Sequence, residues 1–180
     1  FYGNAGGGVH IASGTPTRNL IENIRAHDNL WGIVDADENG NIWRNNVVYD
    51  NASNGGNFIS LSGSEVYNNT FYGNGGAGFW SDTDTTGILF KNNIVYGNTG
   101  GDISLSGTGH TQTTNLTTDP SFTNAAGADF TLQSGSAARD TGTNLSGDGV
   151  TTDYLGTTRP QNGVLDIGAY EYPVASRAAG

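Results

Sequence analysis

The chain has 180 residues, with 29 glycines, no cysteine and no methionine, and 7 basic against 17 acidic residues give a formal net charge of −10. A negative field of this size repels nucleic acids and anionic membranes, so neither is expected as a partner. The lack of cysteine excludes disulfides and thiolate metal sites. No apolar run approaches the length of a membrane span, so membrane insertion is not expected.

One short pattern recurs along the first part of the chain. Its four copies are residues 22–29, 44–51, 67–74 and 91–98. Each of the last three contains an Asn-Asn pair, and the degraded first copy has the single Asn23 in place of the pair. Aligned on Asn23, Asn46, Asn69 and Asn93, the copies lie 23, 23 and 24 residues apart. A repeat this short, rich in strand formers, Gly and Asn and without heptads, is typical of a solenoid of β-strands.

Within each copy, apolar and polar residues alternate as in a strand with one buried face. Three residues before the aligned asparagine the copies carry an apolar residue, namely Leu20, Trp43, Val66 and Phe90. We expect these four side chains to stack in one internal column at the usual strand spacing of about 4.8 Å. The aligned asparagines should form a second column, with amides bonded along the axis.

A corner rich in Gly or Asn follows each copy, and a second strand follows the corner. The second strands are expected at residues 9–13, 33–37, 58–62, 79–84 and 103–106. Two or three short strands per coil and about five coils predict an all-β fold, a single-stranded parallel β-helix. Residues 1–4 match 71–74, so we expect the chain to begin inside a repeat, with earlier coils missing.

Repetition ends near residue 107, and a segment of different character follows. Its distinctive stretches are Asp119-Pro120-Ser121-Phe122, 129–133, 135–142, Arg159-Pro160 and 166–172. Over residues 115–172 the chain resembles the C-terminal region of bacterial secreted right-handed parallel β-helix proteins of the pectate-lyase-like superfamily. Together with the usual chirality of parallel crossovers, the resemblance implies a right-handed helix. It also implies an extracellular protein, secreted or at the cell surface, that acts on a polysaccharide.

These observations divide the chain into coils of about 23 residues at 1–107, a C-terminal coil and capping segment at 108–172, and a flexible tail at 173–180. The open end of a β-helix exposes unpaired backbone and apolar interior. We therefore expect the irregular segment to cover that end. The charged residues Asp140, Arg159, Asp166 and Glu171 are interpreted as partners that fix the loops of this cover.

The second strands carry most of the candidate chemistry. Asp35 and Asp82 both lie eleven residues before an aligned asparagine, and Asp37 and Asp84 both lie nine before. The four carboxylates are therefore expected on one face in two coils separated by roughly 9.6 Å.

Small and titratable residues extend this face. Ser60 and Ser62 lie between the two acidic coils and should leave a depression, while His10 lies in the first coil as a candidate proton carrier. Trp31 and Trp80 are candidate platforms on which a sugar ring could stack.

Three interpretations of the acidic face remain open. Asp35, Asp37 and Glu38 supply the hard oxygens that Ca²⁺ prefers, although the spacing is not that of an EF-hand. Asp35, Asp37, Asp82 and Asp84 could instead include a carboxylate pair for glycoside hydrolysis, with His10 as the proton carrier. In the third interpretation the carboxylates are solvated and serve only solubility.

Two functional classes follow. The first is an extracellular carbohydrate-active protein that binds or cleaves a polysaccharide, as the resemblance implies, whether as a lyase or as a glycosidase. The second is a non-catalytic structural or adhesive β-helix that associates end to end with itself. The fold alone does not choose between them, because function depends on a site.

Overall fold

The computed structural model describes residues 1–12 and 18–173, and the expected flexible tail falls almost entirely outside them. Its coils form three parallel sheets. Sheet I contains β1 (Gly7–Ala12), β4 (Trp31–Ala36), β7 (Gly56–Ile59), β10 (Phe79–Ser81) and β13 (Ile103–Leu105). Sheet II contains β2 (Leu20–Glu22), β5 (Ile42–Arg44), β8 (Glu65–Tyr67), β11 (Leu89–Lys91) and β14 (Thr111–Thr113). Sheet III contains β3 (Arg25–His27), β6 (Val47–Tyr49), β9 (Thr70–Tyr72) and β12 (Ile94–Tyr96).

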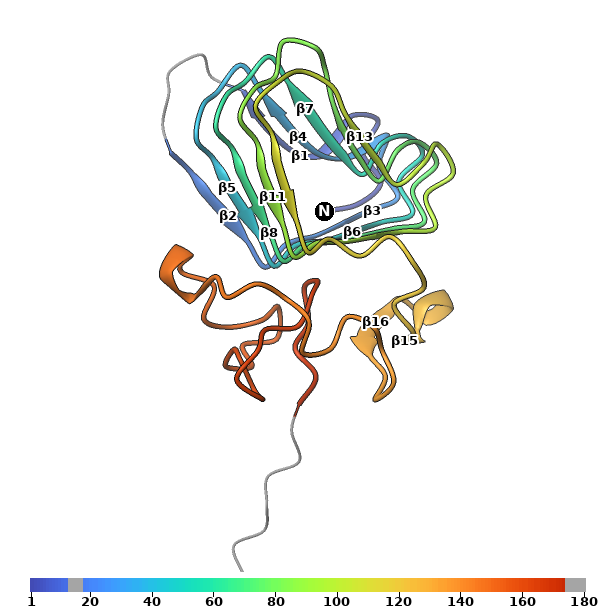
Figure 1. Ribbon diagram of the computed structural model, residues 1–180. Helices are drawn as coiled ribbons and strands as arrows, with labels where there is room; N and C mark the ends of the chain where they lie inside the picture. The colour runs from blue at the N-terminus through green and yellow to red at the C-terminus, as the bar shows by residue number, and fades with distance from the viewer. Residues whose placement is uncertain (13–17, 174–180) are drawn as a thin grey trace, which may run out of the picture.

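The chain visits sheets I, II and III once per coil, and each strand pairs in parallel with the strand one coil later. Figure 1 looks down the axis of this three-sided solenoid. Five strands in sheets I and II enclose about four complete turns, and the predicted all-β parallel solenoid is confirmed. The described residues contain no helix long and apolar enough to cross a membrane.

The predicted internal column is correct for three of its four members. Trp43, Val66 and Phe90 lie in one row and are fully buried. The first member is Ile21, which pairs with Trp43, whereas Leu20 is 48% exposed. The alignment of the degraded first copy was therefore wrong by one residue.

The second asparagine of each pair forms the expected ladder. The backbone N–H of Asn46 donates to Oδ1 of Asn69 at 2.9 Å, and the same bond joins Asn69 to Asn93 and Asn93 to Asn115. In the first coil Ile24, and not Asn23, holds this position, because the N–H of Ile24 donates to Asn46. Each buried amide is thus satisfied by the neighbouring coil.

A second asparagine ladder, which the sequence analysis did not identify, runs along the corner between sheets III and I. It joins Asn29 to Asn51, Asn51 to Asn74 and Asn74 to Asn98 through N–H···Oδ1 bonds of 3.0–3.1 Å. Glycines stand beside this ladder, because a Cβ on Gly78 would lie 2.5 Å from the side-chain amide of Asn98. The Gly-rich composition of the corners follows from this close approach.

The first asparagine of each pair has a different role. Asn45, Asn68 and Asn92 have φ values of 51–55°, the left-handed conformation that asparagine tolerates better than most residues. Their side chains point outward, and their amides donate to backbone oxygens of the C-terminal segment: Thr152, Asp166 and Thr143, each at 2.8 Å.

The C-terminal segment therefore lies along the side of the coil stack. Figure 1 shows it beneath sheets II and III. The antiparallel hairpin β15 (Phe122–Asn124) and β16 (Asp129–Leu132) packs on the tyrosines of sheet III, with the ring centroids of Tyr72 and Phe130 5.4 Å apart. Leu145, Val150 and Leu165 pack on Tyr67 of sheet II. This position differs from the expected cover over the end of the stack.

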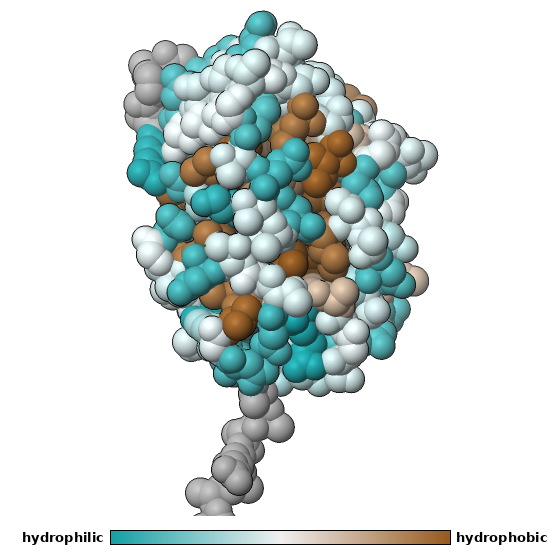
Figure 2. All heavy atoms as spheres, in the orientation of Figure 1, coloured by the Kyte–Doolittle hydropathy of each residue, from teal (hydrophilic) through white to brown (hydrophobic). Residues whose placement is uncertain are grey.

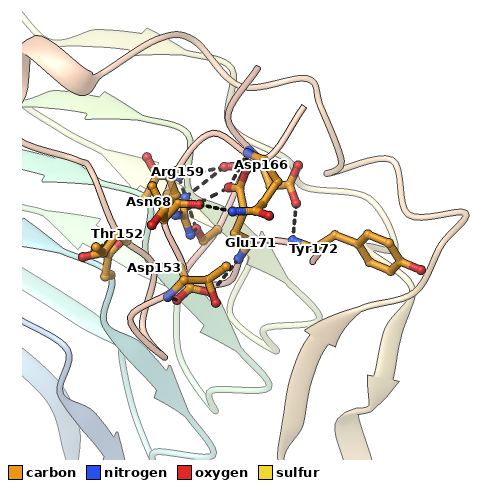
Figure 3. A network of polar contacts seen from close by, with 12 residues as sticks. Asn68, Thr152, Asp153, Arg159, Asp166, Glu171 and Tyr172 are labelled. Carbon is orange, nitrogen blue, oxygen red and sulfur yellow. Dashed lines mark hydrogen bonds and ion pairs between the residues drawn. The ribbon is translucent and has the colours of Figure 1, made fainter. Parts of the chain in front are cut away.

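A buried arginine holds the last part of this segment together (Figure 3). Arg159 is 3% exposed and donates to the backbone oxygens of Asp166 and Gly168. Its Nε lies 3.6 Å from the carboxylate of Glu171. The expected pairing of charged residues is thus present, and it fixes loops at the side of the solenoid.

The ladder makes a stability prediction. Replacing Asn69 by Ala should lower the free energy of unfolding by roughly 1–3 kcal/mol, because the N–H of Asn46 and Oδ1 of Asn93 each lose a buried partner. Urea unfolding followed by circular dichroism measures the change. Asn144→Ala, at an exposed position, is the control, and equal effects in the two variants would contradict the assigned ladder.

The internal column makes a second prediction. Trp43→Ala should cost about 3–5 kcal/mol, because it empties a fully buried site between neighbouring coils. Leu20→Ala, outside the column, should change the free energy of unfolding by less than about 1 kcal/mol. Thermal and urea denaturation of both variants checks the expectation, which a similar loss at the two positions would contradict.

Candidate functional site

Sheet I is the side of the solenoid that the C-terminal segment leaves uncovered within the described residues (Figure 1). One row of its outward side chains is His10, Val34, Asn57, Trp80 and Ser104. His10 and Ser104 are exposed, Trp80 is half-buried, and Val34 and Asn57 are covered by their neighbours. His10, Trp80 and Ser104 therefore share one accessible face, which agrees with the expected common face of His10 and Trp80.

Asp35 does not belong to this face. It pairs with Phe58, and Phe58 pairs with Ser81, so the residue in the row of Asp35 two coils later is Ser81 and not Asp82. The expectation that Asp35 and Asp82 occupy equivalent places was wrong by one residue. In a strand, a shift of one residue moves a side chain to the opposite face of the sheet.

The side chain of Asp35 points into the solenoid and is fully buried. Its carboxylate accepts hydrogen bonds from the indole of Trp43 at 2.9 Å, the amide of Asn41 at 2.8 Å and the hydroxyl of Ser64 at 3.0 Å. Burial raises the pKa of Asp35, and these three donors partly oppose the rise. Glu38, 1% exposed, accepts from the amides of Asn19 and Asn41 in the same internal cluster.

Asp82 is close to Ser60, which confirms that these two residues belong to one surface. The N–H and hydroxyl of Ser60 donate to Asp82 at 3.1 and 3.2 Å, and the hydroxyl of Thr85 donates at 2.6 Å. Burial alone would raise the pKa of Asp82, but these hydrogen bonds hold it below its ordinary value. Asp82 is therefore ionised at neutral pH, which suits an acceptor or an electrostatic anchor better than a general acid.

The remaining expected residues occupy exposed and half-buried positions. Asp37, Asp84 and Ser62 are exposed, and Ser62 donates its N–H to the side chain of Asn39 at 2.8 Å. Trp31 is half-buried at the start of β4.

The three residues expected to bind calcium are divided between two environments. Asp35 and Glu38 point inward, whereas Asp37 is exposed. No group of three His, Asp or Glu side chains in the described part of the chain is arranged to hold a metal ion. Calcium binding stays a prediction.

The structure contains one recess that the sequence analysis missed. It has a volume of about 670 Å³ at the corner between sheets III and I, and it is lined by Gly3, Asn4, Ala5, Asp28, Asn29, Leu30, Asp50 and Ala52. This corner is short in the first coil: five residues separate His27 from Ile33, whereas six separate their partners Tyr49 and Gly56.

Two carboxylates and a stacked column of rings flank this recess. The side chain of Asp28 lies 2.6 Å from Nδ1 of His27, whose ring stacks on Tyr49 with centroids 4.8 Å apart. Burial and the charge of Asp28 raise the pKa of Asp50, and His27 opposes the rise. The signal in the sequence was a substitution at one repeat position, where Asp28 and Asp50 stand in place of Gly73 and Gly97.

The buried carboxylate of Asp35 predicts a pH dependence of stability. Because the pKa of Asp35 is raised in the folded state, the unfolded chain loses this proton at a lower pH than the folded chain does. Over the pH interval that begins at the ordinary pKa of 3.8, the folded state therefore binds more protons than the unfolded state. The contribution of Asp35 to the free energy of unfolding should therefore fall as pH rises through that interval.

Urea unfolding of wild type and Asp35→Asn, at pH values from about 4 to about 8, gives the free energy of unfolding of each as a function of pH. The difference between the two slopes measures the contribution of Asp35. Asp84→Asn removes an exposed carboxylate and should leave the wild-type slope nearly unchanged. A slope for Asp35→Asn equal to that of wild type would show that Asp35 does not contribute.

Comparison with known proteins agrees with this architecture. Searches of the curated proteins and of the solved structures return no match. A family model described as the right handed beta helix region matches residues 1–147, which is most of the chain. This range includes all three parallel sheets and the turns that join them. The chain therefore belongs to the right-handed β-helix family.

Proposed function

We propose that the protein binds a polysaccharide along the outer face of sheet I. The observation that carries the proposal is the position of Trp80, half-buried on the face that the C-terminal segment leaves open, in one row with the exposed His10 and Ser104. A ring held in this way loses little freedom on binding and offers a flat apolar surface to a sugar.

Polar groups beside Trp80 would fix the orientation of the sugar. Asp82 lies two residues further along the chain, about 6.6 Å away along the strand direction. Its ionised carboxylate already accepts from the N–H and hydroxyl groups of both Ser60 and Thr85, which hold it in place, and the exposed hydroxyl of Ser60 keeps acceptor capacity for a sugar hydroxyl. Row spacing places the exposed Ser104 about 4.8 Å from Trp80 in the next coil, and the exposed Ser60 lies in the preceding coil. These groups suit a chain of sugars that runs across the coils.

Binding is better supported than cleavage on this face. A glycosidase needs one carboxyl group that is protonated and one that is ionised, whereas the lowered pKa of Asp82 favours the ionised form. The net charge of −10 favours a neutral saccharide, and a uronate would need a bridging cation such as Ca²⁺. The resemblance of residues 115–172 to secreted proteins supports an extracellular location.

A panel of soluble polysaccharides, measured by calorimetry with Ca²⁺ and with a chelator, tests the proposal. Trp80→Ala should weaken binding about tenfold, since stacking of a ring contributes roughly 0.5–1.5 kcal/mol beyond its buried area. Asp82→Asn should weaken binding less, because the amide keeps part of the hydrogen bonding.

Tyr2→Ala is the matched control, since Tyr2 is 72% exposed on sheet III. Loss of binding in Asp50→Asn, with Trp80→Ala unaffected, would move the site to the recess. Reducing ends or unsaturated products in the same samples would show that the protein also cleaves its ligand. No binding to any polysaccharide would overturn the proposal.

A further inference from the structure

The coil stack ends in an open edge on its C-terminal side. β13 and β14 are the last strands of sheets I and II, and the segment at Leu116 bridges Ile94 as the last part of sheet III. The chain then turns to the side of the stack, so none of the described residues covers this end (Figure 1). Three edges of main-chain N–H and C=O groups therefore face outward, together with the interior of the last coil.

This end also exposes apolar side chains. Ile103 and Leu105 pack on the core from the last coil and are only partly buried, as is Leu116. Figure 2 looks at the same end and shows apolar side chains at the surface in the middle of it, surrounded by polar ones. Exposed apolar surface with a polar rim is typical of a protein–protein contact.

We propose that a second copy of this chain docks on this end through a two-fold axis near Ser104. In the antiparallel pair of β13 strands that results, Ser104 lies opposite Ser104 of the second copy, and Ile103 lies opposite its Leu105. Ile103 and Leu105 both point toward the interior, so each apolar residue meets an apolar residue. This self-complementarity is the requirement for a two-fold interface.

The three-sided cross-section favours a copy of this chain over another partner. A two-fold axis through sheet I exchanges the other two sides, which brings β14 opposite the Leu116 segment of the second copy. All three edges then face an edge, whereas an extended peptide could pair with only one of them.

Charge is compatible with this contact. The chain has a net charge of −10, but residues 100–118 contain only Asp102 and His110 as titratable side chains. Two of these ends can therefore approach with little of the like-charge repulsion that other surfaces of the protein would produce. Because a two-fold contact uses the same end of both copies, the assembly closes as a dimer and does not grow into filaments.

Sedimentation equilibrium of the full chain over a range of concentrations tests the proposal. We expect a dimer with twice the 18.7 kDa mass of the chain. Leu105→Lys should raise the dimer dissociation constant at least tenfold, because it places two lysines in the apolar centre. Leu155→Lys changes a 66% exposed leucine on the side segment and should leave the dimer intact.

A cysteine crosslink keeps the test decisive if Leu105→Lys fails to fold. The chain has no cysteine, so Ser104→Cys introduces a single thiol, and directly opposed residues of an antiparallel pair lie close enough for a disulfide. Mild oxidation with copper phenanthroline should give a covalent dimer of Ser104→Cys and none of Thr151→Cys, at an exposed position of the side segment.

Three results would overturn the proposal: a monomer at all concentrations, a dimer that Leu105→Lys leaves unchanged, or open-ended filaments. None of these measurements involves a saccharide, so their outcome is independent of the proposed function.

Discussion

The structure depends on one hydrogen bond that is repeated from coil to coil. An asparagine side chain can accept from the backbone N–H of the previous coil and donate to main-chain oxygens of that coil, as Asn69 and Asn93 do. This bond satisfies polar groups at the corners between two neighbouring sheets, beyond the ends of the short strands. The strands are only three to six residues long, so the ladders hold coils in register where the strands alone would not.

The second consequence of the asparagine pairs is the asymmetry of the surface. The ladder asparagine points inward, while its neighbour adopts the left-handed conformation and turns its amide outward. Asn45, Asn68 and Asn92 bind the backbone of the C-terminal segment in this way. The same motif that builds the coils therefore also positions the segment over sheets II and III. Within the described residues sheet I carries no such pair, and the C-terminal segment leaves its outer face uncovered (Figure 1).

The sequence predicted the architecture well and the site poorly, for one physical reason. Columns of buried residues repeat with the coil, so period and polarity were enough to place Trp43, Val66 and Phe90. The face on which a side chain lies depends on an alignment that is correct to a single residue. The length of a coil varies from 22 to 24 residues, so the repeat alone does not give that alignment. Asn23, which stands alone where the later copies have an Asn-Asn pair, is the left-handed corner residue with φ of 55° and not the ladder residue. Because of the same error of one residue, Asp35 was expected on the outer face of the solenoid. Its internal hydrogen bonds to Trp43 and Ser64 were therefore not predicted.

The two ladders determine which changes in length the protein can accept during evolution. Each ladder asparagine contacts an equivalent residue one coil away, so removal of a whole internal coil joins two equivalent surfaces and preserves every column. Insertion of one residue inside a strand reverses the faces of all later residues in that strand. Single-residue changes are therefore restricted to the corners, as in the short corner after His27. The ladders themselves accept a change in the number of coils, and the limit on that number comes from the C-terminal segment, which is bound by Asn45, Asn68 and Asn92 of three successive coils.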